Sequence, residues 1–346
     1  MNREPLPRLD TSPEVHDALL PLCRLKPGEI WEDARSGHRV GVLDAADASD
    51  ISRLMASGAT AGIPRSSDTL SARASVIGAG SPGREISSLG IHDPPYNIPA
   101  GRKASGNLFS IDIDSYLGFS RGWIVNAVEA LAPDSSLYIW TGADQERGFQ
   151  PLPELILLLR EFPCLESRSL ITLRNQRGYG TGKNWMCVRQ ELLYYVKGKP
   201  AFTVQYTDIP KILHGYYKEV GGVRTENTER CKSPTIRPGN VWVDIQQVFY
   251  RLPENVPGAY AQKPLKAVTR IIEASSGPGD IVTDFFSHSG TALLASEITG
   301  RRCYAAELDP VFAELSIRRL EHYRETGKPG FQCDNPFPEW GPAGTE

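Results

Sequence analysis

The 346-residue sequence predicts an α/β fold in which helices cover a mixed, mostly parallel sheet. Strand-like and helix-like segments alternate along most of the chain, which is the pattern that such folds produce. An apolar segment at residues 87–92 stops at the rigid corner formed by Asp93, Pro94 and Pro95. A second apolar segment, residues 281–285, runs into a turn of small residues and then a helix.

The expected elements follow this alternation in order. Residues 1–28 form an N-terminal arm that contains several prolines and one short helix. The next expected elements are a strand at 39–43, a helix behind an acidic turn, a surface loop at 62–84, the strand at 87–92, a helix within 110–133 and a strand at 135–142. The remaining ones are a helix at 152–162, strands at 169–176 and 191–199, an irregular segment at 200–255, a helix at 262–276 and a strand, turn, helix and strand within 280–309.

Composition excludes several classes of protein. The net charge of −3 gives no general attraction to nucleic acid or to an acidic membrane, so such binding would need a local basic patch. The six cysteines are scattered singly without a C-x-x-C pair, which argues against a zinc site or a disulfide framework, and we expect no metal. No segment resembles a signal peptide or a membrane span, and we therefore expect a cytoplasmic protein.

The turn after residues 281–285 indicates a nucleotide-type cofactor. It opens a helix whose free backbone amides can receive an anionic group such as a cofactor carboxylate. The next expected strand ends at Glu307, which follows Asp284 by 23 positions. An acid at this spacing commonly binds ribose hydroxyls, and the phosphate-loop pattern G-x-x-x-x-G-K-[ST] is missing from the sequence. The sequence thus favours a cofactor that contains adenosine.

The tetrapeptide Asp93-Pro94-Pro95-Tyr96, followed far downstream by Asp284-Phe285-Phe286 and Ser289-Gly290-Thr291, resembles the amino-methyltransferases of DNA. The order of the two motifs resembles their beta class, and the resemblance covers roughly residues 39–326. It implies a Rossmann-like methyltransferase fold with permuted motif order and an inserted target-recognition region. It also implies transfer of a methyl group from S-adenosylmethionine, which leaves S-adenosylhomocysteine, to an exocyclic amine of a base.

The resemblance assigns the chemistry to the corner. An exocyclic amine is a poor nucleophile because its lone pair is delocalised into the ring, and two hydrogen-bond acceptors would favour the localised form. The family assigns these acceptors to the Asp93 carboxylate and the Pro94 carbonyl, with Pro95 keeping the corner rigid. Tyr96 would stack on a base flipped out of the duplex, whereas the alternative for Tyr96 is a turn aromatic that covers the edge of the core.

The resemblance also implies a set of cofactor-binding residues, which are Asp47, Asp93, Gln262, Lys263, Asp284, Phe286, Ser289, Gly290, Thr291 and Glu307. Asp44 competes with Asp47 for the contact to the cofactor's adenine, and either acid could instead cap a helix. Lys263 could instead be a solvated residue at the start of a helix. His288 stands where the family usually has glycine, which would either weaken cofactor binding or leave an outward-pointing ring, and we favour the outward-pointing ring.

The segment that contains Glu191 resembles the strand beside the target pocket of the family. Trp185, Tyr194 and Tyr195 are candidates for a second wall around the base, or are core residues. Because alternate residues of a strand face opposite sides, Tyr194 and Tyr195 cannot both line the pocket.

The expected target-recognition region, residues 201–257, lies between a catalytic half at 29–200 and a cofactor-binding half at 258–326, and a tail at 327–346 ends the chain. Between residues 197 and 251, nine Lys and Arg stand against five Asp and Glu, a local excess of +4 that suits phosphate contacts but is also common on solvated faces. The candidate DNA contacts are Arg174, Arg177, Lys183, Lys211, Lys218, Arg224, Arg230, Lys232 and Arg237.

The function that we predict is methylation of adenine N6 in duplex DNA, because an Asp-Pro-Pro-Tyr motif is the family's usual choice for adenine. Cytosine N4 is the alternative within the class. Methylation of RNA and a non-catalytic nucleic-acid-binding protein are the alternatives outside it. The expected partners are duplex DNA, a second copy in a homodimer and a cognate restriction endonuclease.

Overall fold

The computed structural model describes residues 6–57, 83–96, 113–142, 151–179, 182, 185–211, 217–226 and 233–340. Within these ranges no helix is both long enough and apolar enough to cross a membrane. The loop expected at residues 62–84 lies outside the described residues except for its last two positions.

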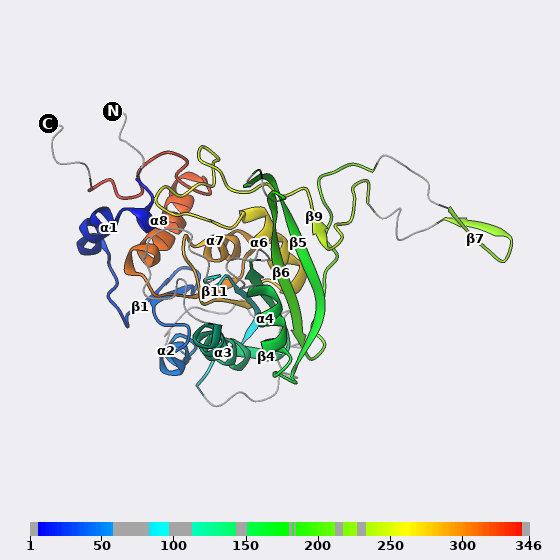
Figure 1. Cartoon of the computed structure of the whole chain (residues 1–346), viewed down its shortest axis with the longest axis horizontal. Helices are drawn as coiled ribbons and strands as arrows, with labels where there is room; N and C mark the ends of the chain where they lie inside the picture. The colour runs from blue at the N-terminus through cyan, green and yellow to red at the C-terminus, as the bar shows by residue number, and fades with distance from the viewer. Residues whose placement is uncertain are drawn as a thin grey trace.

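A sheet of nine strands forms the centre of the molecule, in the order β1-β2-β11-β10-β3-β4-β6-β5-β9 (Figure 1). The strands are β1 (Ile30–Glu32), β2 (Arg39–Val42), β3 (Ser87–His92), β4 (Leu131–Thr141), β5 (Leu165–Tyr179), β6 (Cys187–Lys197), β9 (Val241–Trp242), β10 (Ile281–Asp284) and β11 (Arg302–Glu307). The five strands from β2 to β4 in this order are parallel, whereas β1 and β6 are antiparallel to their neighbours. The prediction of a mixed, mostly parallel sheet is confirmed.

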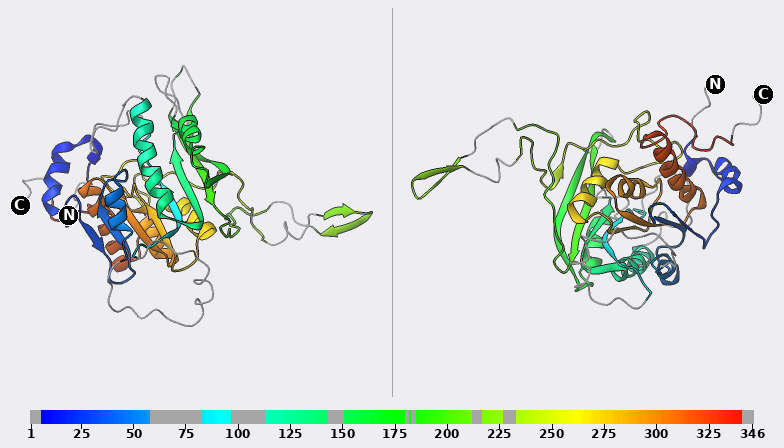
Figure 2. Two further views of the ribbon diagram at one scale, coloured as in Figure 1. Left: turned by 90° about the horizontal axis from the view of Figure 1, so that it is seen from below. Right: turned by 180° about the vertical axis from the view of Figure 1, so that it is seen from behind.

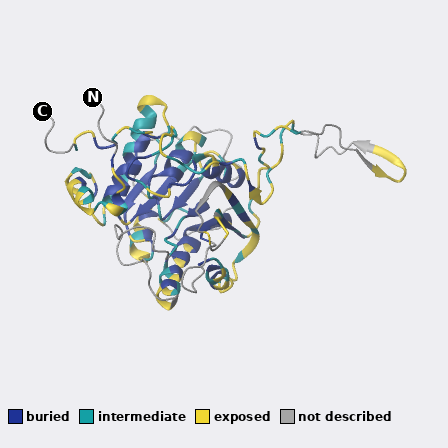
Figure 3. Ribbon diagram, turned by 45° about the horizontal axis from the view of Figure 1, so that its top comes forward, coloured by how far each residue is buried: buried dark blue, intermediate teal, exposed yellow. Residues whose placement is uncertain are grey.

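Helices cover both faces of this sheet, as an α/β fold requires (Figure 2). One apolar layer joins the sheet to α2 (Ala48–Leu54), α3 (Ile113–Ala130) and α4 (Pro151–Leu159). The other joins it to α6 (Leu265–Ser275), α7 (Thr291–Thr299) and α8 (Pro310–Thr326). Figure 3 shows the strands between the two layers as buried. Parallel strands read as continuous apolar runs because both of their faces are covered.

Strands β3 and β10 are neighbours in the sheet although they are far apart in the sequence. Val282 pairs with Leu89, and Thr283 pairs with Gly90. The buried His92 at the end of β3 accepts a hydrogen bond at Nδ1 from the Phe285 backbone N–H, over 3.2 Å. The segments that follow the two strands therefore meet at one edge of the sheet, the edge where ligands of open α/β sheets bind.

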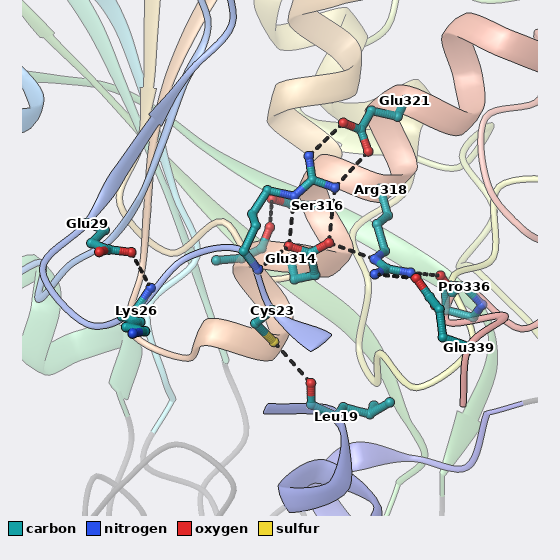
Figure 4. Close-up of polar contacts among 12 residues, drawn as sticks. Leu19, Cys23, Lys26, Glu29, Glu314, Ser316, Arg318, Glu321, Pro336 and Glu339 are labelled. Atoms are coloured by element: carbon teal, nitrogen blue, oxygen red, sulfur yellow. Dashed lines mark hydrogen bonds and ion pairs between the residues drawn. The ribbon is translucent and has the colours of Figure 1, made fainter. Parts of the chain in front are cut away.

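The N-terminal arm packs on α8 together with the C-terminal segment. Apolar residues of the arm, including α1 (Pro13–Leu19), share a buried cluster with α8 and with Phe331 and Phe337. The fully buried Glu314 carboxylate of α8 accepts hydrogen bonds from Arg24 on one side and Arg318 on the other (Figure 4). A buried carboxylate with two arginine partners fixes the arm against α8.

The irregular segment predicted at residues 200–255 contains two features that the sequence did not indicate. Strand β9 adds to the large sheet parallel to β5, and β7 (Tyr217–Val220) pairs with β8 (Val223–Glu226) in a separate hairpin. The hairpin projects away from the body of the molecule (Figures 1 and 2).

Candidate functional site

A pocket opens at the carboxyl edge of the parallel strands, where β3, β4 and β10 end. It is lined by Ile91, Asp93, Trp140, Lys263, Val268, Asp284, Phe286, Ser287, His288, Ser289, Thr291 and Ala292. The two motifs found in the sequence therefore meet in one pocket. Of the predicted site residues, Asp93, Lys263, Asp284, Phe286, Ser289 and Thr291 line it directly.

Both carboxylate oxygens of Asp93 have partners. The Tyr96 hydroxyl donates a hydrogen bond to Oδ1 over 2.7 Å, and Lys263 Nζ donates to Oδ2 over 2.5 Å. Lys263 is buried, and its ammonium lies 5.4 Å from the centre of the Tyr96 ring and 5.3 Å from that of Trp140. Lys263 is therefore part of the pocket and not a solvated residue at the helix start, which was its alternative interpretation.

The rest of the tetrapeptide forms a supported corner. Pro94 is buried, and the Pro95 carbonyl accepts a hydrogen bond from the Tyr116 hydroxyl of α3 over 3.1 Å. Tyr96 is half-buried and packs against the apolar layer below the pocket. The corner is fixed by its two prolines and by this contact to α3, so that the position of Asp93 is well defined.

The turn of residues 287–291, called the cofactor turn below, requires glycine at position 290. Gly290 has φ +70°, a left-handed conformation, and a Cβ at this position would lie 2.6 Å from Cβ of Ser316 in α8. The fully buried Arg319 of α8 supports the turn from below. It donates from Nη1 to the Ser289 carbonyl over 3.0 Å and to Thr291 Oγ1 over 3.1 Å. Helices α7 and α8 thus hold the turn in one shape.

Two buried acids, Asp284 in the pocket and Glu307 beside the turn, lie in an environment that disfavours their charge. Burial, together with the nearby carboxylates of Asp93 and Glu307, raises the pKa of Asp284 to about 8. Burial and the neighbouring Asp309 raise the pKa of Glu307 to about 7. The Glu307 carboxylate accepts hydrogen bonds from the backbone N–H groups of His288 and Asp309, over 2.7 and 3.1 Å. Such a site favours a ligand that carries positive charge.

The expectation that His288 points outward is wrong. Its ring is half-buried, lines the pocket and packs on Phe312, with the ring centres 4.5 Å apart. Its backbone adopts φ +46°, which histidine tolerates better than a branched residue would. Burial lowers its pKa to about 4, so the ring is neutral near pH 7. His288 therefore keeps the shape of the turn that glycine usually gives and adds an aromatic wall.

Two predicted cofactor residues make structural contacts. The Asp47 carboxylate accepts hydrogen bonds from the N–H groups of Ser49 and Asp50, and so caps α2. The Gln262 side chain bonds the backbone at residues 254 and 256, over 2.7 and 3.1 Å. Their contact with the cofactor stays a prediction.

The aromatic candidates for a second wall are separated. Tyr194 stacks on Tyr138 with ring centres 4.3 Å apart, and Tyr195 packs in the apolar layer of α3 and α4 on the other face. This confirms that the two tyrosines face opposite sides. Trp185 is 92% exposed. Glu191 is buried, and the Thr172 hydroxyl donates to it over 2.6 Å.

The candidate DNA contacts fall into three groups. Arg174, Arg224 and Arg237 are exposed, and Lys211 donates from Nζ to the Ser233 carbonyl over 2.5 Å. The side chains of Arg177 and Lys218 are not described, although both residues lie in strands. Lys183, Arg230 and Lys232 lie outside the described residues.

Three residues of the site could not be found from the sequence. Trp140 and Ser287 line the pocket, and Arg319 supports its turn. A tryptophan at a strand end and a serine in a small-residue turn were weak signals, and an arginine within an amphipathic helix gave none. Trp140 Nε1 and Ser287 Oγ are buried without a hydrogen-bond partner among the described residues.

These residues fit an adenosine-containing sulfonium cofactor. Two unpartnered polar atoms belong to residues that line the pocket, and the carboxylates of Asp93 and Asp284 both interact with Lys263. No group of three or more metal-binding side chains occurs in the described part of the chain. With this pocket at the carboxyl edge of a Rossmann-like sheet, the protein falls in the class of S-adenosylmethionine-dependent methyltransferases.

The comparisons with known proteins narrow the class. The profile of a family described as DNA methylase, the N6/N4 group, matches residues 88–318, about two thirds of the chain. The chain belongs to this family of S-adenosylmethionine-dependent DNA methyltransferases.

Several relatives share the same region. The chain is 26% identical over 231 residues to the type II methyltransferase M.HpaI of Haemophilus parainfluenzae, covering 67% of each chain. It is 30% identical over 222 residues to the type II methyltransferase M.BamHI of Bacillus amyloliquefaciens, covering 62% of this chain and 48% of the relative, so it spans about half of that protein. It is 27% identical over 237 residues to the DNA adenine methyltransferase YhdJ of Escherichia coli (strain K12), covering 67% and 76%.

Among solved structures, the cytosine-N4-specific PvuII DNA methyltransferase aligns with a TM-score of 0.48 and 15% identity, over 67% of this chain and 79% of that one. M1.HpyAVI aligns with a TM-score of 0.44 and 17% identity, over 68% and 88%.

Proposed function

We propose that the protein methylates the exocyclic N6 amine of adenine in duplex DNA. The observation that carries this proposal is the Asp93 carboxylate at the rim of the pocket, fixed between the Tyr96 hydroxyl and the Lys263 ammonium. The name of the relative YhdJ, a DNA adenine methyltransferase, supports adenine as the base.

The chain's own residues provide what an amine acceptor needs. Asp93 is an acceptor for one N–H of the amine, and the Pro94 carbonyl is the candidate for the other, since the two prolines hold both groups on one corner. Two acceptors draw the amine toward the geometry in which its lone pair is localised on nitrogen. Tyr96 would contact the face of the flipped base, which positions the amine.

The existing contacts of Asp93 restrict how the target amine can bind. Each acceptor oxygen is already hydrogen-bonded, so the target amine must share or replace the Tyr96 or Lys263 contact. S-adenosylmethionine, when bound, supplies an electrophilic methyl group on a sulfonium. Asp284, Ser287 and Ser289 would hold it, because these buried polar residues line the pocket. Glu307 would assist from beside the turn, where it accepts a hydrogen bond from the His288 N–H. Lys263 lines the pocket and donates to Asp93, so it can orient this carboxylate.

The test is transfer of labelled methyl from S-adenosylmethionine to long unmodified duplex DNA, followed by digestion of the product to nucleosides. We expect label in N6-methyladenine from the wild type. Asp93→Ala should lower transfer about 100- to 1000-fold, because it removes an acceptor made for the transition state. Asp17→Ala, which removes a carboxylate that is 75% exposed in α1, is the matched control and should retain full activity.

Each other outcome contradicts a defined part of the proposal. Label in N4-methylcytosine would keep the role of Asp93 and reject adenine. Transfer to RNA but not to duplex DNA would reject the substrate. Activity of Asp93→Ala equal to that of the control would reject the corner as the acceptor site.

A further inference from the structure

His288 has a backbone conformation that its residue type rarely adopts. Its φ of +46° lies in the left-handed region, which glycine enters freely and asparagine more readily than branched residues do. Gly290 is the other residue of the cofactor turn with a positive φ. A side chain kept at an unfavourable position of a ligand pocket points to a function for that side chain.

His288 lies between two groups that the cofactor has to reach. Its backbone N–H donates to Glu307 Oε2 over 2.7 Å, and Glu307 has the spacing after Asp284 at which an acid binds ribose hydroxyls. His288 also lines the same pocket as Asp93, beside which the transferable methyl group must lie. In S-adenosylmethionine, only a methylene group and the sulfonium sulfur separate the ribose from that methyl group. This part of the cofactor therefore passes His288.

One face of the His288 ring is backed by an aromatic neighbour. The buried Phe312 of α8 lies with its ring centre 4.5 Å away and its ring plane tilted by 38°. The His288 ring itself is half-buried and lines the pocket. Phe312 thus holds the ring in place from behind, and the other face is available to a ligand.

The other aromatic rings that line the pocket are already engaged. The Lys263 ammonium lies 5.3 Å from the centre of the Trp140 ring. Phe286 packs against Trp123 of α3, with the ring planes at 89° and the ring centres 5.4 Å apart. Among these rings, His288 is therefore the best placed to contact a positively charged group of the cofactor.

The His288 ring is neutral at the point where the cofactor is positive. Because burial lowers the pKa of His288 to about 4, the ring carries no charge near pH 7. A protonated imidazole would repel a sulfonium, whereas the face of a neutral aromatic ring attracts a cation. S-adenosylhomocysteine, the product, has lost the methyl group and with it the positive charge on sulfur. The product therefore gains nothing from this attraction.

We infer that His288 is a specificity-determining residue for the cofactor, whose ring face contacts the sulfonium and makes the pocket prefer S-adenosylmethionine over S-adenosylhomocysteine. This inference rests on the proposed function for the place of the methyl group, and it is independent of which base is methylated. Its consequence is that methyl transfer removes the charge that the ring attracts. Fresh cofactor then replaces the product more easily.

The experiment compares the full-length wild type with His288→Asn, which suits a left-handed backbone but has no ring, and with His288→Phe, which keeps a ring. His322→Asn is the matched control, because His322 also stacks on a phenylalanine, Phe331, with ring centres 4.5 Å apart, but does not line the pocket. Isothermal titration calorimetry without DNA measures binding of S-adenosylmethionine, S-adenosylhomocysteine and sinefungin, an analogue with an ammonium group in place of the methylsulfonium. Thermal unfolding checks that each variant is folded.

The preference for S-adenosylmethionine over S-adenosylhomocysteine, taken as the ratio of their dissociation constants, should fall about three- to tenfold in His288→Asn. Binding of S-adenosylhomocysteine should change less than about threefold, because only van der Waals contacts are lost. Sinefungin should lose affinity together with S-adenosylmethionine, since both carry the charge. His288→Phe should keep the wild-type ratio within about twofold, and His322→Asn should leave it unchanged.

An unchanged ratio in His288→Asn would overturn the inference, even if both affinities fell together, because the ring would then only shape the turn. A folded His288→Phe with a ratio as low as that of His288→Asn would also overturn it, and so would sinefungin that behaves like S-adenosylhomocysteine. If the ratios are as expected but the wild type methylates no adenine, the proposed function fails while this inference stands. If the wild type binds no S-adenosylmethionine, both fail.

Discussion

Asp284 carries a stability cost that a single substitution should remove. Its carboxyl group is buried at the end of β10, where burial and the carboxylates of Asp93 and Glu307 raise its pKa from 3.8 to about 8. Since the pKa is higher in the folded chain than in the unfolded one, the folded protein keeps a proton that the unfolded protein releases. Stability is therefore lost as the pH rises from about 4 to about 8. Asp284→Asn abolishes this loss.

The size of the effect follows from the shift. About four pKa units at 1.36 kcal/mol each give an upper limit of about 5 kcal/mol at pH 8. Relaxation of the pocket around the charge reduces this, and we expect a gain of about 2–4 kcal/mol. The asparagine Oδ1 can still accept the hydrogen bond that Asp284 receives from the Phe286 N–H over 3.1 Å, so this backbone donor keeps its partner.

The assay is thermal unfolding of both proteins without cofactor between pH 5 and pH 8.5. The midpoint of Asp284→Asn should exceed that of the wild type by about 3–8 °C at pH 8 and by little at pH 5. Added S-adenosylhomocysteine should raise the wild-type midpoint more than that of the variant, because its ammonium group complements the charged Asp284. Glu166→Gln, at a β5 side chain that is 67% exposed, is the control and should not alter the pH dependence. Equal pH dependence in the wild type and Asp284→Asn would refute the reasoning.

Three further outcomes are expected from features outside this carboxylate. In denaturant unfolding, Gly290→Ala should destabilise the protein by about 2–4 kcal/mol, and it should also weaken cofactor binding. Gly300→Ala is the control, because Gly300 has the same φ of +70° but nothing lies within 4 Å of an added Cβ; it should cost only about 1 kcal/mol. Glu314→Gln should cost about 2–4 kcal/mol by leaving two arginines with a weaker partner, and the 41% exposed Glu321 changed to Gln should cost less than about 1 kcal/mol. A hydrogen bond to the buried Asp309 carboxylate raises the pKa of His16. The protonated ring therefore stabilises the folded protein below pH 6.5, and this stabilisation is lost as the pH rises through the folded pKa. In denaturant unfolding, His16→Gln should be less stable than the wild type at about pH 5.5, and the difference should shrink by about pH 9.

Local chemistry made much of the site predictable. The two prolines after Asp93 stop a strand wherever they occur, and the small residues before Thr291 form a turn that opens a helix. The alternation of apolar strands and helices predicted a parallel sheet, whose strand ends meet at one edge. These signals depend only on residues that are close together in the sequence. The structure brings the corner and the turn that they predict into one pocket.

Contacts between distant segments could not be predicted in the same way. Lys263 meets Asp93 across 170 positions, because α6 starts at the edge where β3 ends. Arg319 reaches the cofactor turn from the middle of α8, where the sequence pattern shows only an amphipathic helix. The packing of His288 on Phe312 likewise depends on how α8 crosses the turn, and this made the expected outward ring wrong.

The pairing of β3 with β10 has a consequence for the way in which the chain is made. Leu89 and its partner Val282 are separated by nearly 200 residues, which a ribosome adds in about 10–40 s. During that interval β3 has one open edge, and non-local parallel pairs form late in folding. A nascent chain that has not reached β10 thus holds the Asp93 corner without the turn of residues 287–291, and an unpaired strand that other chains can join. Synthesis of β10 and the turn after it is therefore the step at which the pocket is completed and the open edge of β3 is covered.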